Sequence, residues 1–395
     1  RIMKIDTIKY SLGRKKARLS GQITLKGGKT HEIYFEVDTE YKSLIAKDAS
    51  PFLAASLAIA MKKHEDLEID GDLSTKLMAN TSRIMKIIQS WGFGYSTISI
   101  HAKSLKIDLE KSQNIGCFFS GGVDSFYTFL RNKHKIDSLI FVHGFDISVK
   151  DKRLYRKVEK NIEKIARKEK VRLVKVKTNI REMFEQYFDW DMSHAFALAS
   201  VSLFLSQGFK EIYMSCGQVD DNAAHQYMSP EIDALWSTEN MKIHHFGCDA
   251  GKISKLRFLS GFPVVMQNLR VCWVNKGNAY NCGGCEKCLR NMLALYVVDS
   301  LEKCTTFKAG INLSKLESIR ANKYVLQYFI AAHKALRKKN NQSDITLALE
   351  KCIRNNQFPS LKQRTFRDIR GFIRFIDNRY NSNRLYWYFT KANVI

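Results

Sequence analysis

The sequence predicts an α/β protein whose central segment, residues 109–305, forms a parallel sheet with helices between its strands. Between residues 109 and 250, short apolar runs alternate with amphipathic helical segments, a pattern typical of parallel strands joined by crossover helices. The flanking segments have different patterns. Residues 1–108 are typical of a small α+β domain, and residues 306–395 are predicted to form a basic helical domain.

The composition is that of a globular protein. The chain has 395 residues, of which 45% are hydrophobic, so it can build large cores and is not intrinsically disordered. No apolar run reaches the roughly 18 residues that a membrane span needs, so we expect no membrane contact. Nine cysteines without a signal-like start favour a reducing, cytoplasmic compartment, in which cysteines serve as thiols or metal ligands rather than disulfides.

The net charge of +25 leaves two interpretations open. A protein this basic is typical of one that binds nucleic acid, but a lysine-rich solvated surface gives the same count. About half of the excess lies in residues 301–395, which have 19 Lys plus Arg against 6 Asp plus Glu. Aromatic residues such as Tyr324 and Trp387 are interleaved there. They suit stacking on RNA bases or, alternatively, the core of the helical domain itself.

The N-terminal segment is predicted to begin with a β-hairpin. Two alternating runs, residues 17–25 and 31–37, flank a glycine turn. This turn contains Gly-Gly-Lys-Thr, but the glycine that a P-loop has five residues earlier is replaced by Ile23, so we expect no phosphate site there. The later predicted elements are a helix opening at Pro51, a strand at 67–69, a helix at 73–91 and a strand at 95–101.

The central segment is predicted to begin with a buried strand at residues 115–119, followed by Ser120-Gly-Gly-Val-Asp-Ser125 and a helix. Two glycines allow a sharp turn, and the start of the helix presents N–H groups and the positive end of its dipole, so the turn is expected to bind an anion such as pyrophosphate. His143 and the loop from residue 218 to 224 should lie at the same sheet edge. The remaining predicted elements are strands at 138–142, 171–176 and 211–214 and helices at 152–168 and 193–206.

A cysteine cluster follows the predicted sheet. Cys282, Cys285 and Cys288 form two Cys-x-x-Cys steps that share their middle residue, which places three thiolates around one ion. Cys272 is the simplest fourth ligand, and Cys248 and Cys304 are the alternatives.

Four thiolates suit a structural Zn²⁺, with an iron–sulfur cluster as the alternative. Ferredoxin-type runs place a further cysteine four residues on and then a proline, and here that position is Met292, which favours zinc. Cys117, Cys216 and Cys352 are predicted to be small buried residues, and Cys216, at the end of a strand, is the one to test for a chemical role.

Two of these motifs together resemble those of a known family. Ser120-Gly-Gly-Val-Asp-Ser125 after a strand resembles the PP-loop of the ATP-pyrophosphatase (adenylating) superfamily, which includes GMP synthetase, asparagine synthetase, transfer-RNA thiolases and 7-cyano-7-deazaguanine synthase. Cys272 followed by Asn281-Cys-Gly-Gly-Cys-Glu-Lys-Cys-Leu-Arg290 is similar to the zinc site of 7-cyano-7-deazaguanine synthase. The resemblance covers roughly residues 112–300 and implies an adenine nucleotide alpha hydrolase-like fold for this domain.

The resemblance also implies an activity. ATP would bind at residues 120–125, through the backbone of Gly121, Gly122 and Val123 and the hydroxyls of Ser120 and Ser125, with Asp124 anchoring Mg²⁺. A small-molecule carboxylate would become an adenylate, pyrophosphate would leave, and ammonia or an amine would displace AMP. Longer proteins of this type occur in bacterial antiviral defence clusters, so the implied ligase joins a 7-deazaguanine-like carboxylate to an amine, including an amine of a protein partner.

The acceptor site is predicted from position alone. His194 and Asp220 fall near the ligand edge of the sheet, and Lys255 is a cation suited to an anionic substrate, although an ordinary surface or capping role fits each of them equally well. Two other classes of function stay open. One is a transfer-RNA-modifying enzyme, such as a thiolase, whose basic C-terminal domain binds RNA. The other is a partner module that has kept the fold without the chemistry.

Overall fold

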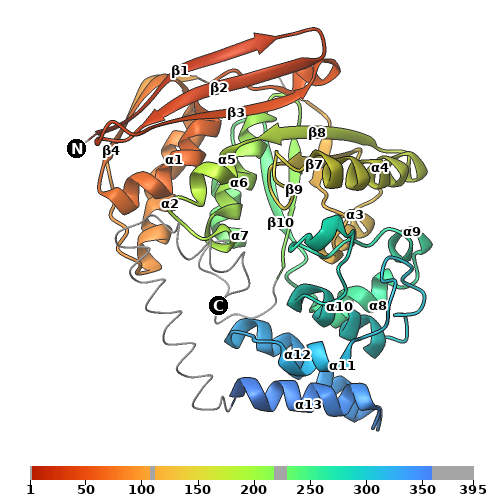
Figure 1. The fold of residues 1–395 in the computed structure, drawn as a ribbon. Coiled ribbons are helices and arrows are strands. Elements are labelled where there is room, and N and C mark those ends of the chain that lie inside the picture. Colours follow the sequence, from red (N-terminus) through yellow and green to blue (C-terminus); the bar gives the residue numbers. More distant parts are fainter. Residues whose placement is uncertain (1, 107–111, 218–228, 358–395) are drawn as a thin grey trace. The chain divides into compact units, whose positions relative to one another are not determined.

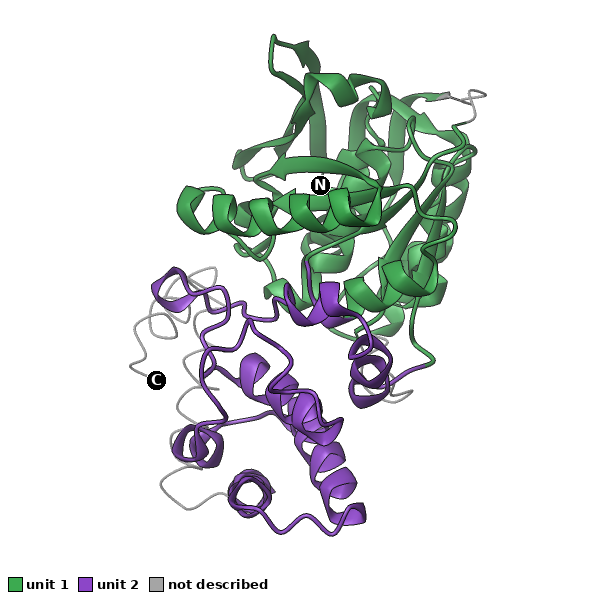
Figure 2. Ribbon diagram, turned by 90° about the vertical axis from the view of Figure 1, so that its right-hand side faces the viewer, with its two compact units in different colours: residues 1–120, 124–249 green, residues 121–123, 250–395 purple. Residues whose placement is uncertain are grey.

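The computed structural model describes residues 2–106, 112–217 and 229–357 (Figure 1). The chain divides into two compact units (Figure 2). The first contains residues 1–120 and 124–249, and the second contains residues 121–123 and 250–395.

A ten-stranded sheet forms the centre of the first unit, in the order β10-β9-β6-β7-β8-β3-β2-β1-β4-β5. The strands from β10 to β8 pair in parallel, the strands from β8 to β1 are antiparallel neighbours, and β1, β4 and β5 are parallel again. The predicted α/β class, with a large and mostly parallel sheet, is confirmed. The strands are β1 Ile2–Leu12, β2 Lys16–Thr24, β3 Thr30–Asp38, β4 Asp66–Ser74, β5 Ile100–Lys106, β6 Ile115–Phe118, β7 Ser138–His143, β8 Arg172–Thr178, β9 Glu211–Ser215 and β10 Lys242–Phe246.

Helices cover both faces of the parallel part of the sheet. Side chains alternate along β7, so that Ile140 and Val142 join the core shared with helices α1 and α6, while Phe141 stacks on Tyr155 of α4. Such two-sided burial explains why residues 139–142 of β7 are a continuous apolar run in the sequence. The helical elements of this part of the chain are η1 Thr39–Leu44, α1 Ser50–Lys63, α2 Thr75–Ser90, α3 Val123–Arg131, α4 Lys152–Glu169, α5 Ile180–Phe184, α6 Trp190–Phe204 and α7 Pro230–Leu235.

The N-terminal strands continue the central sheet. The predicted hairpin is confirmed by the β2–β3 register, which runs from Lys16 opposite Asp38 to Thr24 opposite Thr30. Strand β3 then pairs with β8, with Phe35 opposite Thr178. The segment therefore shares one sheet and one core with the segment that follows it. The division into domains at 1–108, 109–305 and 306–395 stays a prediction about independent folding.

The strand predicted at residues 95–101 is wrong in its position. The structure places β5 at Ile100–Lys106, five residues further along the chain. Tyr95 is buried, but it lies outside any strand and its ring packs against Trp91 and Phe188. An aromatic core residue thus lies in a connecting segment, because burial alone does not require a β conformation.

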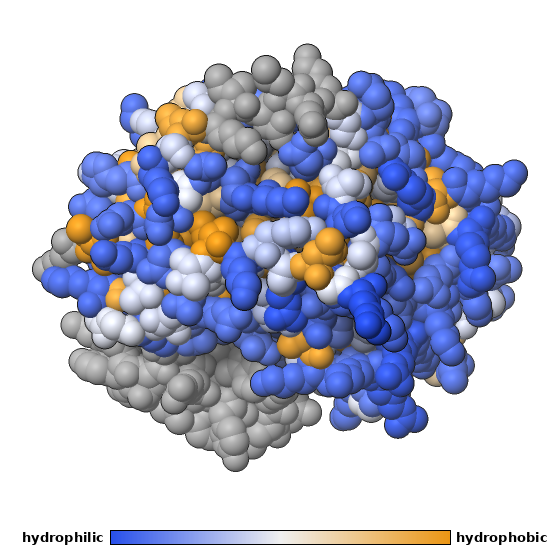
Figure 3. Space-filling view, turned by 90° about the horizontal axis from the view of Figure 1, so that it is seen from above, coloured by the Kyte–Doolittle hydropathy of each residue, from blue (hydrophilic) through white to orange (hydrophobic). Residues whose placement is uncertain are grey.

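The face seen from the side of β1, β2 and β3 is mostly hydrophilic, with hydrophobic residues in small separate patches (Figure 3). The alternation in β2 explains part of this, because Ala17 and Leu19 are fully buried while the side chain of Arg18 is 37% exposed. No helix among the described residues is long and apolar enough to cross a membrane.

Gly144, just after β7, is a backbone position with no room for a side chain. Its φ is +114°, and a Cβ there would lie 1.9 Å from the carbonyl oxygen of Thr178. We expect Gly144→Ala to destabilise the protein by about 3 kcal/mol, because a strained φ adds to a backbone clash. A fall in Tm of roughly 6–12 °C in thermal unfolding would follow. Gly27→Ala is the matched control, since no atom lies within 4 Å of its Cβ position, and equal effects of the two substitutions would contradict this assignment.

The second unit is helical in its described part. Helices α10, α12 and α13 pack around Leu293, Phe329 and Leu349, which have no exposed surface. The prediction that the chain after residue 306 is mostly helical is confirmed as far as residue 357. Most of the aromatic residues weighed as RNA contacts or as core of this domain lie in 358–395, outside the described residues. The helical elements are α8 Lys252–Leu259, α9 Pro263–Met266, η2 Lys276–Asn278, α10 Glu286–Val297, α11 Leu313–Ser318, α12 Lys323–Lys338 and α13 Asp344–Gln357.

Candidate functional site

The predicted anion loop connects β6 to α3. Phe119 is tied to the neighbouring strand by its N–H, which donates to the Ile140 carbonyl at 2.8 Å. Gly121 then adopts a φ of +76°, which is open to glycine at little cost and lets the chain turn into the helix. The N–H of Ser120 donates to Oγ of Ser125 at 3.3 Å, and the two hydroxyl oxygens lie 3.5 Å apart. The loop therefore brings both predicted serines to the start of α3.

The loop lies where the strand order of the sheet reverses. From β6 the chain runs outward through β7 to β8, and it then returns to the other side of β6 to form β9 and β10. This order is that of a Rossmann-like core, in which ligands bind at the carboxyl ends of the strands beside the reversal. Asp124 faces this point, because its Oδ2 lies 4.0 Å from the Cβ position of Gly217, two residues beyond β9.

Arg270 is a residue at the loop that sequence reasoning missed. Its N–H donates to the carbonyl of Gly121 at 2.8 Å, and its guanidinium donates to Oδ1 of Asn275 at 2.7 Å. The residue is only 4% exposed, and among the described residues its Nε has no hydrogen-bond partner. A buried guanidinium with donor capacity left is suited to an anion. The position just before Cys272 is the only signal that could have singled it out.

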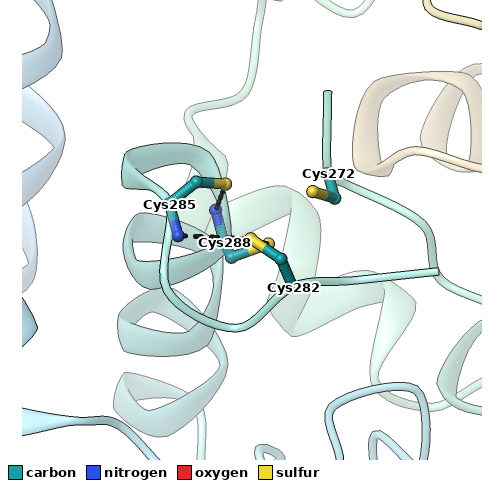
Figure 4. Close-up of side chains that lie close together, drawn as sticks. All are labelled: Cys272, Cys282, Cys285 and Cys288. Carbon is teal, nitrogen blue, oxygen red and sulfur yellow. Dashed lines mark hydrogen bonds between the residues drawn. The ribbon is translucent and has the colours of Figure 1, made fainter. Parts of the chain in front are cut away.

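The four cysteines predicted as metal ligands come together. Their sulfur atoms all lie within 4.8 Å of one another, and Sγ of Cys282 lies 3.9 Å from Sγ of Cys288 (Figure 4). Tetrahedral Zn²⁺ with Zn–S bonds of about 2.3 Å separates its sulfurs by about 3.8 Å, so the cluster fits the ion. Cys272 is thus the fourth member of the cluster, and the alternatives Cys248 and Cys304 lie outside it.

Backbone N–H groups orient the thiols at the start of α10. The N–H of Cys285 donates to Sγ of Cys282 at 3.3 Å, and the N–H of Cys288 donates to Sγ of Cys285 at 3.4 Å. The second contact caps the helix, because Cys285 occupies its N-cap position. Hydrogen bonds with Cys285 and Cys288 hold the pKa of Cys272 far below its usual value, while the hydrogen bond with Cys272 raises the pKa of Cys285 to about 12. Hydrogen bonds thus link Cys272, Cys285 and Cys288 within the cluster.

Two of the three candidate substrate residues lie among the described residues, one in each unit. His194, in α6, is half-buried, and its Nδ1 contacts the carbonyl of Asp191 at 3.0 Å. Lys255, in α8 of the second unit, is 1% exposed. Asp220 lies outside the described residues. The roles of these three residues stay predictions.

A second group near the sheet edge combines residues that sequence reasoning did not connect. Burial is the largest influence on the pKa of Asp233 and raises it, while the hydrogen bond with His245 and the charges of His245 and His194 act in the opposite direction. His194 therefore lies within electrostatic range of Asp233. Cys216 and Cys248 lie beside His245, and all three are close enough to share a metal ion. The His245-Phe-Gly-Cys248 spacing was the one local sequence pattern that could have indicated this group.

Comparison of the chain with protein-family models, with curated proteins and with solved structures finds no match in any of the three. The fold and the sites therefore define the class by themselves: an α/β protein with a Rossmann-like parallel core, a glycine loop at its reversal point and a four-cysteine group that fits a metal ion.

Proposed function

We propose that this chain is an ATP-dependent adenylating ligase, similar in chemistry to 7-cyano-7-deazaguanine synthase. In the proposed reaction a carboxylate oxygen attacks the α-phosphorus of ATP, and the bond from this phosphorus to the bridging oxygen breaks to release pyrophosphate. The nitrogen of ammonia or an amine then attacks the acyl carbon, loses a proton and displaces AMP. A 7-deazaguanine-like acid is the proposed carboxylate, and a protein amine in a bacterial antiviral defence system is the proposed acceptor.

The observation that supports this proposal most is the position of the Ser120–Ser125 loop. It follows β6 at the reversal of the parallel sheet, where this class of fold binds nucleotides. The loop also leads into the first turn of α3, and the positive end of this helix dipole favours a phosphate group. The four-cysteine group supports the comparison with 7-cyano-7-deazaguanine synthase in particular, because the resemblance implied both features in this order.

Each side chain of the loop has a proposed role. The Ser120 and Ser125 hydroxyls would donate to the leaving pyrophosphate, and Asp124 would hold Mg²⁺, which supplies positive charge to phosphate oxygens when bound. Arg270, whose backbone N–H contacts Gly121, has a buried guanidinium that is proposed to bind the same anion. Donors fixed by the fold would stabilise developing charge with little rearrangement.

Product analysis tests the reaction. The full-length protein is incubated with ATP, Mg²⁺ and a panel of 7-deazaguanine carboxylates, with ammonia or a peptide amine as acceptor. We expect AMP and pyrophosphate in equal amounts, formed only when a carboxylate is present, and a new amide in the mass spectrum. Formation of ADP and phosphate would contradict the proposal. So would a lack of ATP binding in calorimetry, which would favour the partner module.

The basic charge of the C-terminal segment gives transfer RNA a place in the same panel. An RNA-modifying enzyme would release AMP only when transfer RNA is present, and its RNA affinity would fall steeply with salt as counterions are released. Amide formation in the absence of RNA separates the two functions.

A further inference from the structure

We propose a second metal site in this protein, formed by Cys216, His245 and Cys248, that binds Zn²⁺ with two thiolates and one imidazole. One potential ligand atom from each residue lies within 4.8 Å of the other two. The roles proposed for the glycine loop and the four-cysteine group do not involve these residues. The inference is independent of the proposed ligase activity.

Two neighbouring strands place the three ligands. Strands β9 and β10 are parallel, with Met214 opposite His245, and the N–H of Cys216 donates to the carbonyl of Phe246 at 2.8 Å. Cys216 and Cys248 both follow the carboxyl ends of their strands, so their thiols approach His245 from the edge of the sheet where ligands of such folds bind. The site therefore rests on regular backbone in the first unit.

Asp233 orients the imidazole. Its Oδ2 lies 2.5 Å from Nδ1 of His245, and the side chains are only 1% and 2% exposed. When Asp233 is ionised, this contact makes Nδ1 the protonated nitrogen, which leaves Nε2 to bind a metal. A carboxylate behind a histidine is the usual outer partner of a zinc ligand, where it sets the tautomer and increases the basicity of the ring.

The burial of Asp233 also favours a cation at this place. Among the described residues its Oδ1 has no hydrogen-bond partner, so the carboxylate is only partly compensated by His245. A buried carboxylate in this state is costly, and a divalent ion on the far side of the imidazole supplies the missing positive charge.

The chemistry of the ligands selects the ion. Two thiolates and an imidazole suit Zn²⁺ better than Mg²⁺ or Ca²⁺, which prefer oxygen ligands. Tetrahedral coordination places sulfur and nitrogen ligands about 3.6 to 3.8 Å apart, so the three side chains need to move by about 1 Å at most. The described residues supply three ligands, which leaves a fourth position for solvent or a substrate atom, as in catalytic zinc sites.

Metal analysis of the full-length protein tests this site. The protein and its variants are loaded with Zn²⁺ under reducing conditions and desalted. Their zinc content per chain is then measured by inductively coupled plasma mass spectrometry. We expect Cys216→Ala and Cys248→Ala each to lose one equivalent of zinc per chain relative to the unsubstituted protein. The matched control is Cys352→Ala, which removes another buried cysteine and should lose none. Cys282→Ala should lose a different equivalent, so the double variant Cys216→Ala/Cys282→Ala loses two.

A more conservative substitution separates loss of zinc binding from misfolding of the variant. Asp233→Asn keeps all three ligands, and we expect it to weaken zinc at this site by 10- to 100-fold in competition with a chelator. Equal zinc content in the unsubstituted protein, Cys216→Ala and Cys248→Ala would overturn the proposal. Fast alkylation of Cys216 in the zinc-loaded protein, lost in His245→Ala, would also overturn it and indicate a cysteine nucleophile activated by histidine.

Discussion

Replacement of Asp124 by asparagine should lower the rate of AMP and pyrophosphate formation by at least a hundredfold at saturating ATP. The substitution keeps the shape of the side chain and removes the negative charge that is proposed to hold Mg²⁺ at the phosphates. Loss of a single preorganised group at such a site typically costs about 2.7–4 kcal/mol of transition-state stabilisation. The measurement is kcat for AMP release, together with the Mg²⁺ concentration that gives half of the maximal rate, which should rise.

The structure supplies a matched control for Asp124. Asp124 lies in the first turn of α3, where a carboxylate also favours the helix dipole, so part of any effect could come from stability. Asp151 caps α4, a helix that packs against the same sheet, with its Oδ1 accepting from the N–H of Leu154 at 3.0 Å. Asparagine caps a helix as well as aspartate does, so Asp151→Asn should keep both activity and Tm. Equal activities of Asp124→Asn and Asp151→Asn would refute the Mg²⁺ role.

Strands β6, β7 and β9 were predictable because two-sided burial makes each one a short apolar run bounded by turns. The β2–β3 hairpin was predictable from its alternation, but β1 and β10 were not. In β1 the only buried side chains are Met3 and Ile5, and β10 is Lys-Ile-His-His-Phe, in which polar residues predominate. The join between β3 and β8 had no sequence signal either, because it consists of backbone hydrogen bonds between segments more than a hundred residues apart.

The sites also differ in whether a local sequence pattern predicts them. Ser120–Ser125 and the three clustered cysteines are local motifs, so their spacing alone predicts a turn and a metal site. Cys216, Asp233 and His245 meet only because β9, α7 and β10 pack together, and no regular spacing relates them. Because no local spacing connects Cys248 with Cys216, the sequence offered Cys248 only as an alternative ligand of the four-cysteine cluster. In the structure the end of β10 places its thiol beside Cys216.

Loss of the four-cysteine site should unfold the helical unit rather than alter the chemistry. Helix α10 begins inside the cluster, with Cys285 as its N-cap and Cys288 in its first turn, and two turns later Leu293 and Val297 enter the helical core. Binding of structural zinc contributes directly to folding free energy. We therefore expect Cys288→Ala to destabilise this unit by about 3 kcal/mol or more, against about 1–2 kcal/mol for Cys352→Ala.

The two substitutions are matched, because each removes a fully buried sulfur from a helix of the second unit, and only Cys288 belongs to the cluster. Thermal unfolding followed by circular dichroism, with and without a strong zinc chelator, separates the two effects. The chelator should lower the Tm of the unsubstituted protein and of Cys352→Ala, because removal of a ligand of the native state costs its binding free energy. It should leave Cys288→Ala unchanged. A colourless protein whose Tm falls on chelation fits structural zinc, whereas visible absorption that bleaches on reduction would identify an iron–sulfur cluster instead.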